Sequence, residues 1–201
     1  MKKSTCLKCN AEIVDSEALC SKCVAEKMAM THRMNIQTCL PAKFWDLNTD
    51  QKDLLKQAMN KNLFISGNPG SGKTVFACSV AKEYLKTTKV KFISYPAFIM
   101  QLQCAFRDEK VNPAEMVNRI AKDTGVLILD DLGAEKLTDF VRQTTYFILN
   151  EREQWNLRTI ITSNFTLSKL DEQVDPRISS RIAGMCKVLK FNGKDRRLEN
   201  K

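Results

Sequence analysis

One stretch of the chain has the residue types and the spacing of a phosphate-binding loop. Residues 67–74 read Gly-Asn-Pro-Gly-Ser-Gly-Lys-Thr, which fits the pattern GxxxxGK[ST]. Glycines let the backbone curl until successive N–H groups face phosphate oxygens, and the positive end of the following helix dipole attracts the same charge. The pattern therefore predicts a site for the phosphates of a nucleotide. Its residues are Gly67, Asn68, Pro69, Gly70, Ser71, Gly72, Lys73 and Thr74.

Two side chains of this loop have expected roles of their own. Lys73 is expected to reach the β- and γ-phosphates of ATP, and the Thr74 hydroxyl to ligate Mg²⁺. The alternative is an ordinary glycine turn with a surface lysine. The flanking sequence favours the phosphate site, because residues 63–66 are apolar enough for a preceding strand and residues 75–80 suit a following helix.

A pair of acidic residues supplies the second half of the expected site. Asp130 and Asp131 follow the all-apolar run 126–129. Acids at the carboxyl end of a buried strand lie at the edge of the sheet where ligands bind. We expect Asp130 to hold Mg²⁺, usually through water, and Asp131 to polarise the attacking water as a general base. The alternative is a strand that ends in an acidic turn.

Four of the eight cysteines form two CxxC pairs near the N-terminus. Cys6 and Cys9 are separated by ten residues from Cys20 and Cys23. Four thiolates in paired turns suit tetrahedral Zn²⁺, and the metal would supply most of the folding energy of a segment too short to bury a core. Zinc is therefore the expected ligand, with disulfides, an iron–sulfur cluster and free thiols as the alternatives.

The elements that must position these groups alternate between β-type and helical patterns from residue 63 onward. Strands are expected at 63–66, 90–95, 126–129, 158–162 and 188–191. Helices are expected at 21–30, 50–60, 74–86, 96–106, 112–122, 138–155 and 175–183. Such alternation predicts an α/β fold with a parallel sheet between helices. The expected parts are a zinc-binding module at residues 1–31, a connector at 32–60 and a P-loop domain at 61–201.

The totals fit one α/β domain with a small appendage. The chain has 201 residues, of which 43% are hydrophobic and 27% charged, as in ordinary core-forming proteins. No apolar run is long enough for a membrane span, and no secretory signal follows the N-terminus, so a cytoplasmic location is expected. The net charge of +9 favours a polyanionic partner such as nucleic acid.

Taken together, the motifs resemble the DnaC/DnaI/IstB-like AAA+ ATPases, which are bacterial and phage helicase loaders with related transposition helpers. The motifs that carry the resemblance are the loop 67–74, Asp130-Asp131-Leu132-Gly133-Ala134-Glu135-Lys136, Thr162-Ser163-Asn164 and Arg177-Ile178-Ser179-Ser180-Arg181-Ile182. It covers about residues 40–197. It implies a three-layer AAA+ P-loop fold without a C-terminal lid, because only 37 residues follow Asn164.

The resemblance also implies roles for three further residues. Asn164 matches sensor 1, which orients water near the γ-phosphate; the alternative is a polar residue at a strand end. Arg181 matches the arginine finger that reaches the nucleotide of a neighbouring subunit, and Arg177 is the second candidate for contact with nucleotide. Either arginine could instead lie on a solvated helix face. A finger that acts in trans implies a homo-oligomer with nucleotide at the subunit interfaces.

In the family, the helical segment after the second strand contacts single-stranded DNA. Here Tyr95, Phe98, Phe106 and Arg107 are the candidates, although aromatic residues at helical spacing belong more often to a core. The cysteine module stands where family members place their partner-binding domain. We therefore favour docking on a protein over docking on DNA or a purely structural role.

The expected function is that of an ATP-dependent loader that binds ATP, Mg²⁺, single-stranded DNA and a DnaB-like replicative helicase, with Zn²⁺ in the N-terminal module and no membrane association. One alternative is an IstB-like transposition helper with the same ATPase site. Another is a zinc-finger adaptor whose nucleotide site is a switch without significant turnover. A small-molecule P-loop kinase fits less well, because the acidic pair with Asn164 and Arg181 suits hydrolysis.

Overall fold

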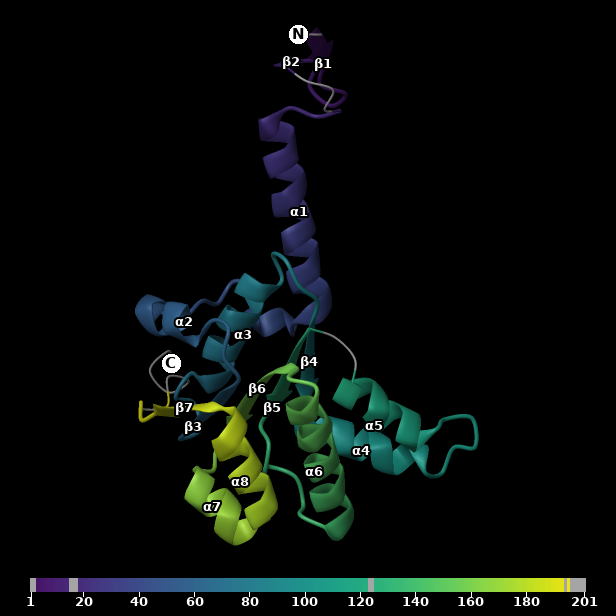
Figure 1. Cartoon of the computed structure of the whole chain (residues 1–201), viewed down its shortest axis with the longest axis vertical. Helices are drawn as coiled ribbons and strands as arrows, with labels where there is room; N and C mark the ends of the chain where they lie inside the picture. Colours follow the sequence, from purple (N-terminus) through teal and green to yellow (C-terminus); the bar gives the residue numbers. More distant parts are fainter. Residues whose placement is uncertain (1–2, 15–17, 123–124, 194, 196–201) are drawn as a thin grey trace. The chain divides into compact units, whose positions relative to one another are not determined.

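The computed structural model describes residues 3–14, 18–122, 125–193 and 195. The chain divides into two compact units, Met1–Cys39 and Leu40–Lys201 (Figure 1). This division differs from the expected boundary after residue 31, because helix α1 (Ser21–Cys39) continues past residue 30. Its second half contains neither glycine nor proline, and the first helix-breaking residue is Pro41.

The N-terminal unit consists of a small hairpin and the helix α1. Strands β1 (Lys3–Thr5) and β2 (Glu12–Val14) pair in the antiparallel sense, and Thr5 lies opposite Glu12. The sequence did not predict this hairpin, because strands of three residues are too short to show a period of two.

The second unit is built on a parallel sheet of five strands in the order β4-β5-β6-β3-β7. The strands are β3 (Leu63–Gly67), β4 (Val90–Ser94), β5 (Val126–Asp130), β6 (Arg158–Ser163) and β7 (Lys187–Phe191). The predicted α/β class and all five predicted strands are confirmed. Because the strands are parallel, the loops that follow β3, β5 and β6 meet at one edge of the sheet.

Helices cover both faces of the sheet. They are η1 (Ala42–Phe44), α2 (Lys52–Ala58), α3 (Lys73–Tyr84), α4 (Tyr95–Ala105), α5 (Pro113–Lys122), α6 (Asp139–Gln154), α7 (Leu167–Gln173) and α8 (Pro176–Met185). Figure 1 shows α3 on one side of the sheet and α4, α5 and α6 on the other. Of these helices, α7 and the single turn η1 were not predicted. No helix among the described residues has the length and apolar character needed to cross a bilayer.

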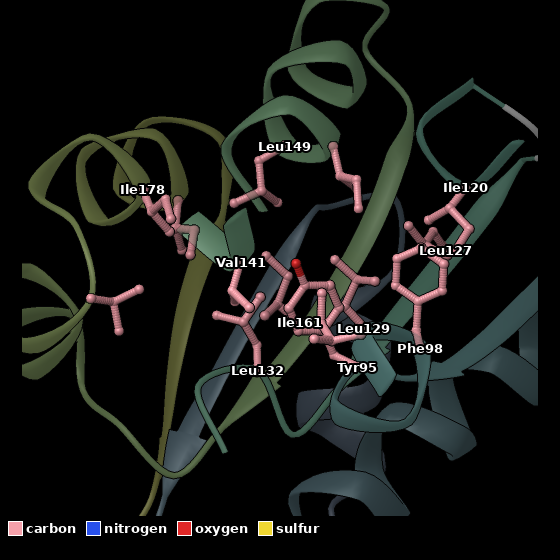
Figure 2. Packing of buried hydrophobic residues seen from close by; sticks show 14 of the residues in the cluster. Tyr95, Phe98, Ile120, Leu127, Leu129, Leu132, Val141, Leu149, Ile161 and Ile178 are labelled. Atoms are coloured by element: carbon pink, nitrogen blue, oxygen red, sulfur yellow. The ribbon is translucent and has the colours of Figure 1, made fainter. Parts of the chain in front are cut away.

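The alternation of side chains along β5 determines which face of the sheet the side chain of its last residue, Asp130, lies on. Leu127 and Leu129 belong to the hydrophobic cluster that also contains Tyr95 and Leu149 (Figure 2). Successive side chains of a strand point to opposite faces, so Asp130 points away from this cluster, toward the face covered by α3. The helix that begins in the glycine-rich loop therefore lies beside the acidic end of β5.

Candidate functional site

The loop between β3 and α3 has glycines at the positions where its backbone excludes other residues. Gly67 has a φ of +154°, and a Cβ there would lie 2.0 Å from the carbonyl oxygen of Phe191. Gly72, with a φ of +93°, precedes α3 and has no side chain to cap the helix. The N-terminus of α3 therefore has no side-chain cap from Gly72, and its dipole would favour an anion there.

Lys73 is buried within this loop. Its Nζ donates hydrogen bonds of 2.9 Å to the Gly67 carbonyl, 2.8 Å to the Asn68 carbonyl and 2.9 Å to Oδ1 of Asn164. The last bond joins the loop to the end of β6. The structure therefore brings the proposed phosphate-binding lysine and the proposed sensor residue together.

The Thr74 hydroxyl contacts the acidic end of β5. Thr74 Oγ1 donates to Oδ1 of Asp130 over 2.9 Å, and Thr162 Oγ1 donates to the same oxygen over 2.7 Å. Burial raises the pKa of Asp130, while these two hydroxyl donors lower it. A hydroxyl and a carboxylate side by side are ligands that suit Mg²⁺, so the residues present fit the expected ion.

Asp131 lies in an unusual backbone conformation directly after β5. Its φ is +60°, a region that aspartate tolerates better than most residues. Its N–H donates to Thr162 Oγ1 over 2.9 Å, and the residue is half-buried. Thr162, which contacts both acids, was assigned no role from the sequence. Its signals there are its place in the motif Thr162-Ser163-Asn164 and a hydroxyl in a strand that is otherwise apolar at its centre.

The phosphate loop also contacts the C-terminal segment. A Cβ at Gly70 would lie 1.7 Å from Oδ1 of Asp195, and one at Gly193 would lie 3.8 Å from the Ser71 carbonyl oxygen. The carboxylate of Asp195 therefore lies against a loop whose geometry suits anions. No motif in the sequence indicated this contact.

Arg177 and Arg181 lie together on α8, over the ring of Tyr146 in α6. Their guanidinium carbons are 5.3 Å and 4.9 Å from the centre of that ring. Arg177 forms an ion pair with Asp175 at 2.8 Å, which lowers the pKa of that carboxyl, while Arg181 pairs with Glu153 and donates to the Tyr146 hydroxyl over 3.0 Å. Among the described residues, these contacts join α8 to α6 and to Asp175, the residue before α8, and do not involve the phosphate loop. The two arginines line a surface hollow of 470 Å³.

The four candidates for DNA contact divide into two pairs. Tyr95 and Phe98 are buried in the hydrophobic cluster, so the structure assigns them to the core. Phe106 is 63% exposed and packs edge-on against Phe140 at 5.3 Å, and Arg107 beside it is exposed. Both line a groove of 810 Å³. Only this second pair remains accessible to a ligand.

The cysteines of the N-terminal unit converge as a metal site requires. The sulfur atoms of Cys6, Cys9, Cys20 and Cys23 all lie within 4.8 Å of one another, and Cys9 and Cys20 are 3.6 Å apart. Tetrahedral Zn²⁺ with bonds of about 2.3 Å needs sulfurs about 3.8 Å apart. Backbone N–H groups, first that of Cys20, lower the pKa of Cys6 to about 6, whereas burial raises the pKa of Cys23 to about 12. The four residues therefore fit a zinc ion.

Comparison with known proteins gives matches that span most of the chain. Residues 47–201 match the family model for the IstB-like ATP binding protein. The replicative helicase loader DnaI of Bacillus subtilis is 28% identical over 170 residues, which cover 78% of this chain and 54% of that protein. The phage-like element PBSX protein XkdC of the same organism is 30% identical over 137 residues, or 66% of this chain and 50% of that protein. The chain thus spans about half the length of these relatives.

Solved structures share the fold. The DnaC helicase loader superposes with a TM-score of 0.64 at 23% identity, over 76% of this chain and all of that chain. The structure of DnaI superposes with a TM-score of 0.60 at 23% identity, over 94% of this chain and 91% of that chain. The structure of AMPPCP-bound DnaA from Aquifex aeolicus superposes with a TM-score of 0.61 at 21% identity, over 78% of this chain and 49% of that chain. These likenesses confirm the predicted AAA+ P-loop fold, and the match over residues 47–201 shows that the chain belongs to the family of IstB-like ATP binding proteins.

Proposed function

We propose that this chain is an ATP-hydrolysing loader that binds single-stranded DNA and helps to place a replicative helicase on it. Membership of an ATP-binding family supports ATP as the bound nucleotide. The similarity to the helicase loader DnaI supports helicase loading as the task. The observation that carries the proposal is the meeting of Lys73, Thr74, Asp130 and Asn164 at one edge of the sheet. These four residue types at one place suit a nucleoside triphosphate and its metal.

Each residue of the site has a distinct part in hydrolysis. The backbone of the loop 67–74 and the ammonium group of Lys73 hold the β- and γ-phosphates, and Thr74 and Asp130 hold Mg²⁺, which when bound neutralises phosphate charge. Asp131 accepts a proton from the attacking water. Oδ1 of Asn164 accepts a hydrogen bond from Lys73. When a phosphate draws Lys73 toward itself, the amide of Asn164 becomes available to orient the water.

The two arginines act on the nucleotide of a neighbouring subunit in this proposal. Arg181 exchanges its bonds to Glu153 and Tyr146 for a phosphate oxygen, and Arg177 lies beside it on the same ring. A guanidinium group suits this exchange because it stays charged and offers several donors. The proposal therefore includes a homo-oligomer with nucleotide between subunits.

Partner binding is proposed for two other surfaces. Phe106 and Arg107 offer a base-stacking ring and a cation for a phosphate, which are the usual elements of a single-strand site. The zinc-binding cysteine module is proposed to dock on the helicase. The description of the matching family favours one second candidate, an IstB-like transposition helper, in which the same ATPase site acts for a transposase.

The test is ATP turnover by the intact chain with and without an oligo(dT) single strand. Single strands are expected to raise kcat, and Asp131→Asn is expected to lower it about 100-fold or more while nucleotide still binds. Phe106→Ala with Arg107→Ala should remove the stimulation, whereas Met100→Ala, at an exposed apolar residue within α4, should keep it. Turnover that ignores single strands would contradict the loader. Nucleotide binding without turnover would instead favour the switched adaptor.

Capture experiments distinguish the two kinds of partner. Immobilised chain is expected to retain a purified replicative helicase from the same host in the presence of ATP. Retention of the host's transposase without retention of the helicase would favour the transposition helper.

A further inference from the structure

Thr162 is a fully buried hydroxyl residue that the mechanism above does not use. It lies in β6 after the apolar residues Ile160 and Ile161, and none of its side chain is exposed. A buried hydroxyl is costly unless it forms hydrogen bonds. Its hydrogen bonds therefore indicate what this position contributes.

The Thr162 hydroxyl both donates and accepts a hydrogen bond at the acidic pair Asp130 and Asp131. Thr162 Oγ1 donates its proton to Oδ1 of Asp130 over 2.7 Å and accepts the N–H of Asp131 over 2.9 Å. A hydroxyl has only one proton, so this arrangement commits the donor to the carboxylate and a lone pair to the backbone. One atom thereby fixes two adjacent residues with different proposed tasks.

The backbone after β5 depends on this support. A regular strand would turn Asp131 toward the hydrophobic cluster, because side chains alternate between faces. Instead Asp131 has a φ of +60° and Leu132 enters the cluster. The Leu132 N–H donates to the Thr162 carbonyl over 2.9 Å, and Ser163 Oγ donates to the Leu132 carbonyl over 2.6 Å. The end of β6 thus holds the turn that directs Asp131 away from the core.

We propose that Thr162 is a positioning residue for ATP hydrolysis, which fixes the metal-binding carboxylate of Asp130 and the backbone of Asp131 relative to each other. The inference rests on the proposed function. Since Asn164 follows two residues later, the end of β6 sets the relative places of the acids and of the residue that orients water. Among the described residues the Thr162 hydroxyl forms its hydrogen bonds with Asp130 and Asp131 and none with the loop residues 67–73. Its proposed role therefore lies in the chemical step and not in holding the phosphates.

The test compares Thr162→Val, which keeps the shape and removes the hydroxyl, with Thr162→Ser, which keeps the hydroxyl. Thr162→Val is expected to lower kcat at least about tenfold, with the KM for ATP within about twofold of wild type, because misplaced catalytic groups slow chemistry more than binding. The Mg²⁺ concentration for half-maximal rate should rise. Thr162→Ser should recover most of kcat.

A matched control lies in the same strand. Thr159 is also fully buried, and its Oγ1 accepts from Arg152 over 2.8 Å and donates to the Leu157 carbonyl over 3.0 Å. Thr159→Val therefore removes a buried hydroxyl from the opposite end of β6 and is expected to leave kcat unchanged below its melting temperature. Should Thr162→Val fail to fold, Thr162→Cys replaces it, since a thiol is only a weak donor.

The outcomes separate this inference from the proposed function. Wild-type chain without ATP turnover contradicts both. Wild-type turnover with an unchanged kcat in Thr162→Val contradicts the positioning role alone, as does a Thr162→Ser variant as slow as Thr162→Val. A loss of kcat that is matched by Thr159→Val also overturns it, because the effect would then be one of stability.

Discussion

Thr74 and Asp130, which are 56 residues apart in the sequence, are joined by a hydrogen bond of 2.9 Å from the threonine hydroxyl to the aspartate carboxylate. This bond ties the first turn of α3 to the last residue of β5. The loop that suits phosphates therefore lies next to the carboxylate that suits a metal ion.

The ligand-free protein should gain stability when the Asp130 charge is removed. Burial, and then the charge of Asp131, raise the pKa of Asp130 above its usual value near 4. Folding therefore favours the protonated Asp130, and its contribution to the free energy of unfolding is complete below the usual pKa. This contribution is lost as the pH rises through the raised pKa. Asp130→Asn should therefore raise the free energy of unfolding by about 1 kcal/mol at neutral pH, with a smaller gain at lower pH.

Thermal unfolding without nucleotide between pH 5 and 8 measures this difference. The exposed Asp53, 3.8 Å from Lys56, provides the control, and Asp53→Asn should change stability by less than about 0.5 kcal/mol. An Asp130→Asn variant that melts below wild type at pH 8 would contradict the electrostatic argument.

Arg181→Ala should leave nucleotide affinity unchanged and lower turnover about 1000-fold, because a finger stabilises only the transferring phosphoryl group. An equimolar mixture with Asp131→Ala should regain activity, since some interfaces then combine an intact Asp131 with an intact Arg181. Steady-state ATPase assays at several protein concentrations give the answer. Arg119→Ala, which removes an exposed arginine paired with Glu115, serves as the control. A mixture as inactive as its components would argue against action in trans.

Asp195→Asn should strengthen nucleotide binding. The Asp195 carboxylate lies against Gly70, where phosphate oxygens are expected, and like charges at such distances cost about 1 kcal/mol even in water. The dissociation constant for ATP, measured by titration calorimetry, should fall roughly fivefold. Glu172→Gln removes an exposed acid of α7 and should have no effect. Weaker binding in Asp195→Asn would show that this carboxylate helps to hold the nucleotide.

Replacing Cys6 and Cys9 by serine should release one zinc ion and leave ATP turnover intact, because the cysteines and the phosphate loop belong to different compact units. Metal analysis of the purified protein gives the stoichiometry, and the unstimulated ATPase rate gives the second readout. Cys104→Ser, at an exposed cysteine outside the cluster, should keep the metal. Retained zinc in the double variant would exclude the four-cysteine site.

The strands and the phosphate loop could be predicted because their signals are local. The apolar run before Asp130 and the glycine spacing of the loop depend on neighbouring residues only. The N-terminal hairpin and α7 were missed because short elements show little periodicity, and α1 was predicted too short because its second half is polar.

Contacts between distant segments could not be read from the sequence. Thr162 meets the acidic pair only because β5 and β6 are neighbours in the sheet, and Asp195 meets Gly70 only because β7 lies beside β3. Helical spacing likewise could not separate Phe98, which is buried, from Phe106, which is exposed. Spacing predicts that a helix has an apolar face, whereas the packing of α5 and α6 decides where that face ends.

Binding of MgATP to the wild-type chain and to Lys73→Ala, measured by titration calorimetry, tests the central claim most directly. Lys73 lies buried in the loop and is expected to contribute a charge-assisted contact of about 3 kcal/mol. Wild type should bind one nucleotide per chain, and Lys73→Ala should bind about 100-fold more weakly or not at all. Lys52→Ala, at an exposed lysine of α2, should match wild type. Wild-type affinity in Lys73→Ala would contradict the placement of the phosphates in this loop.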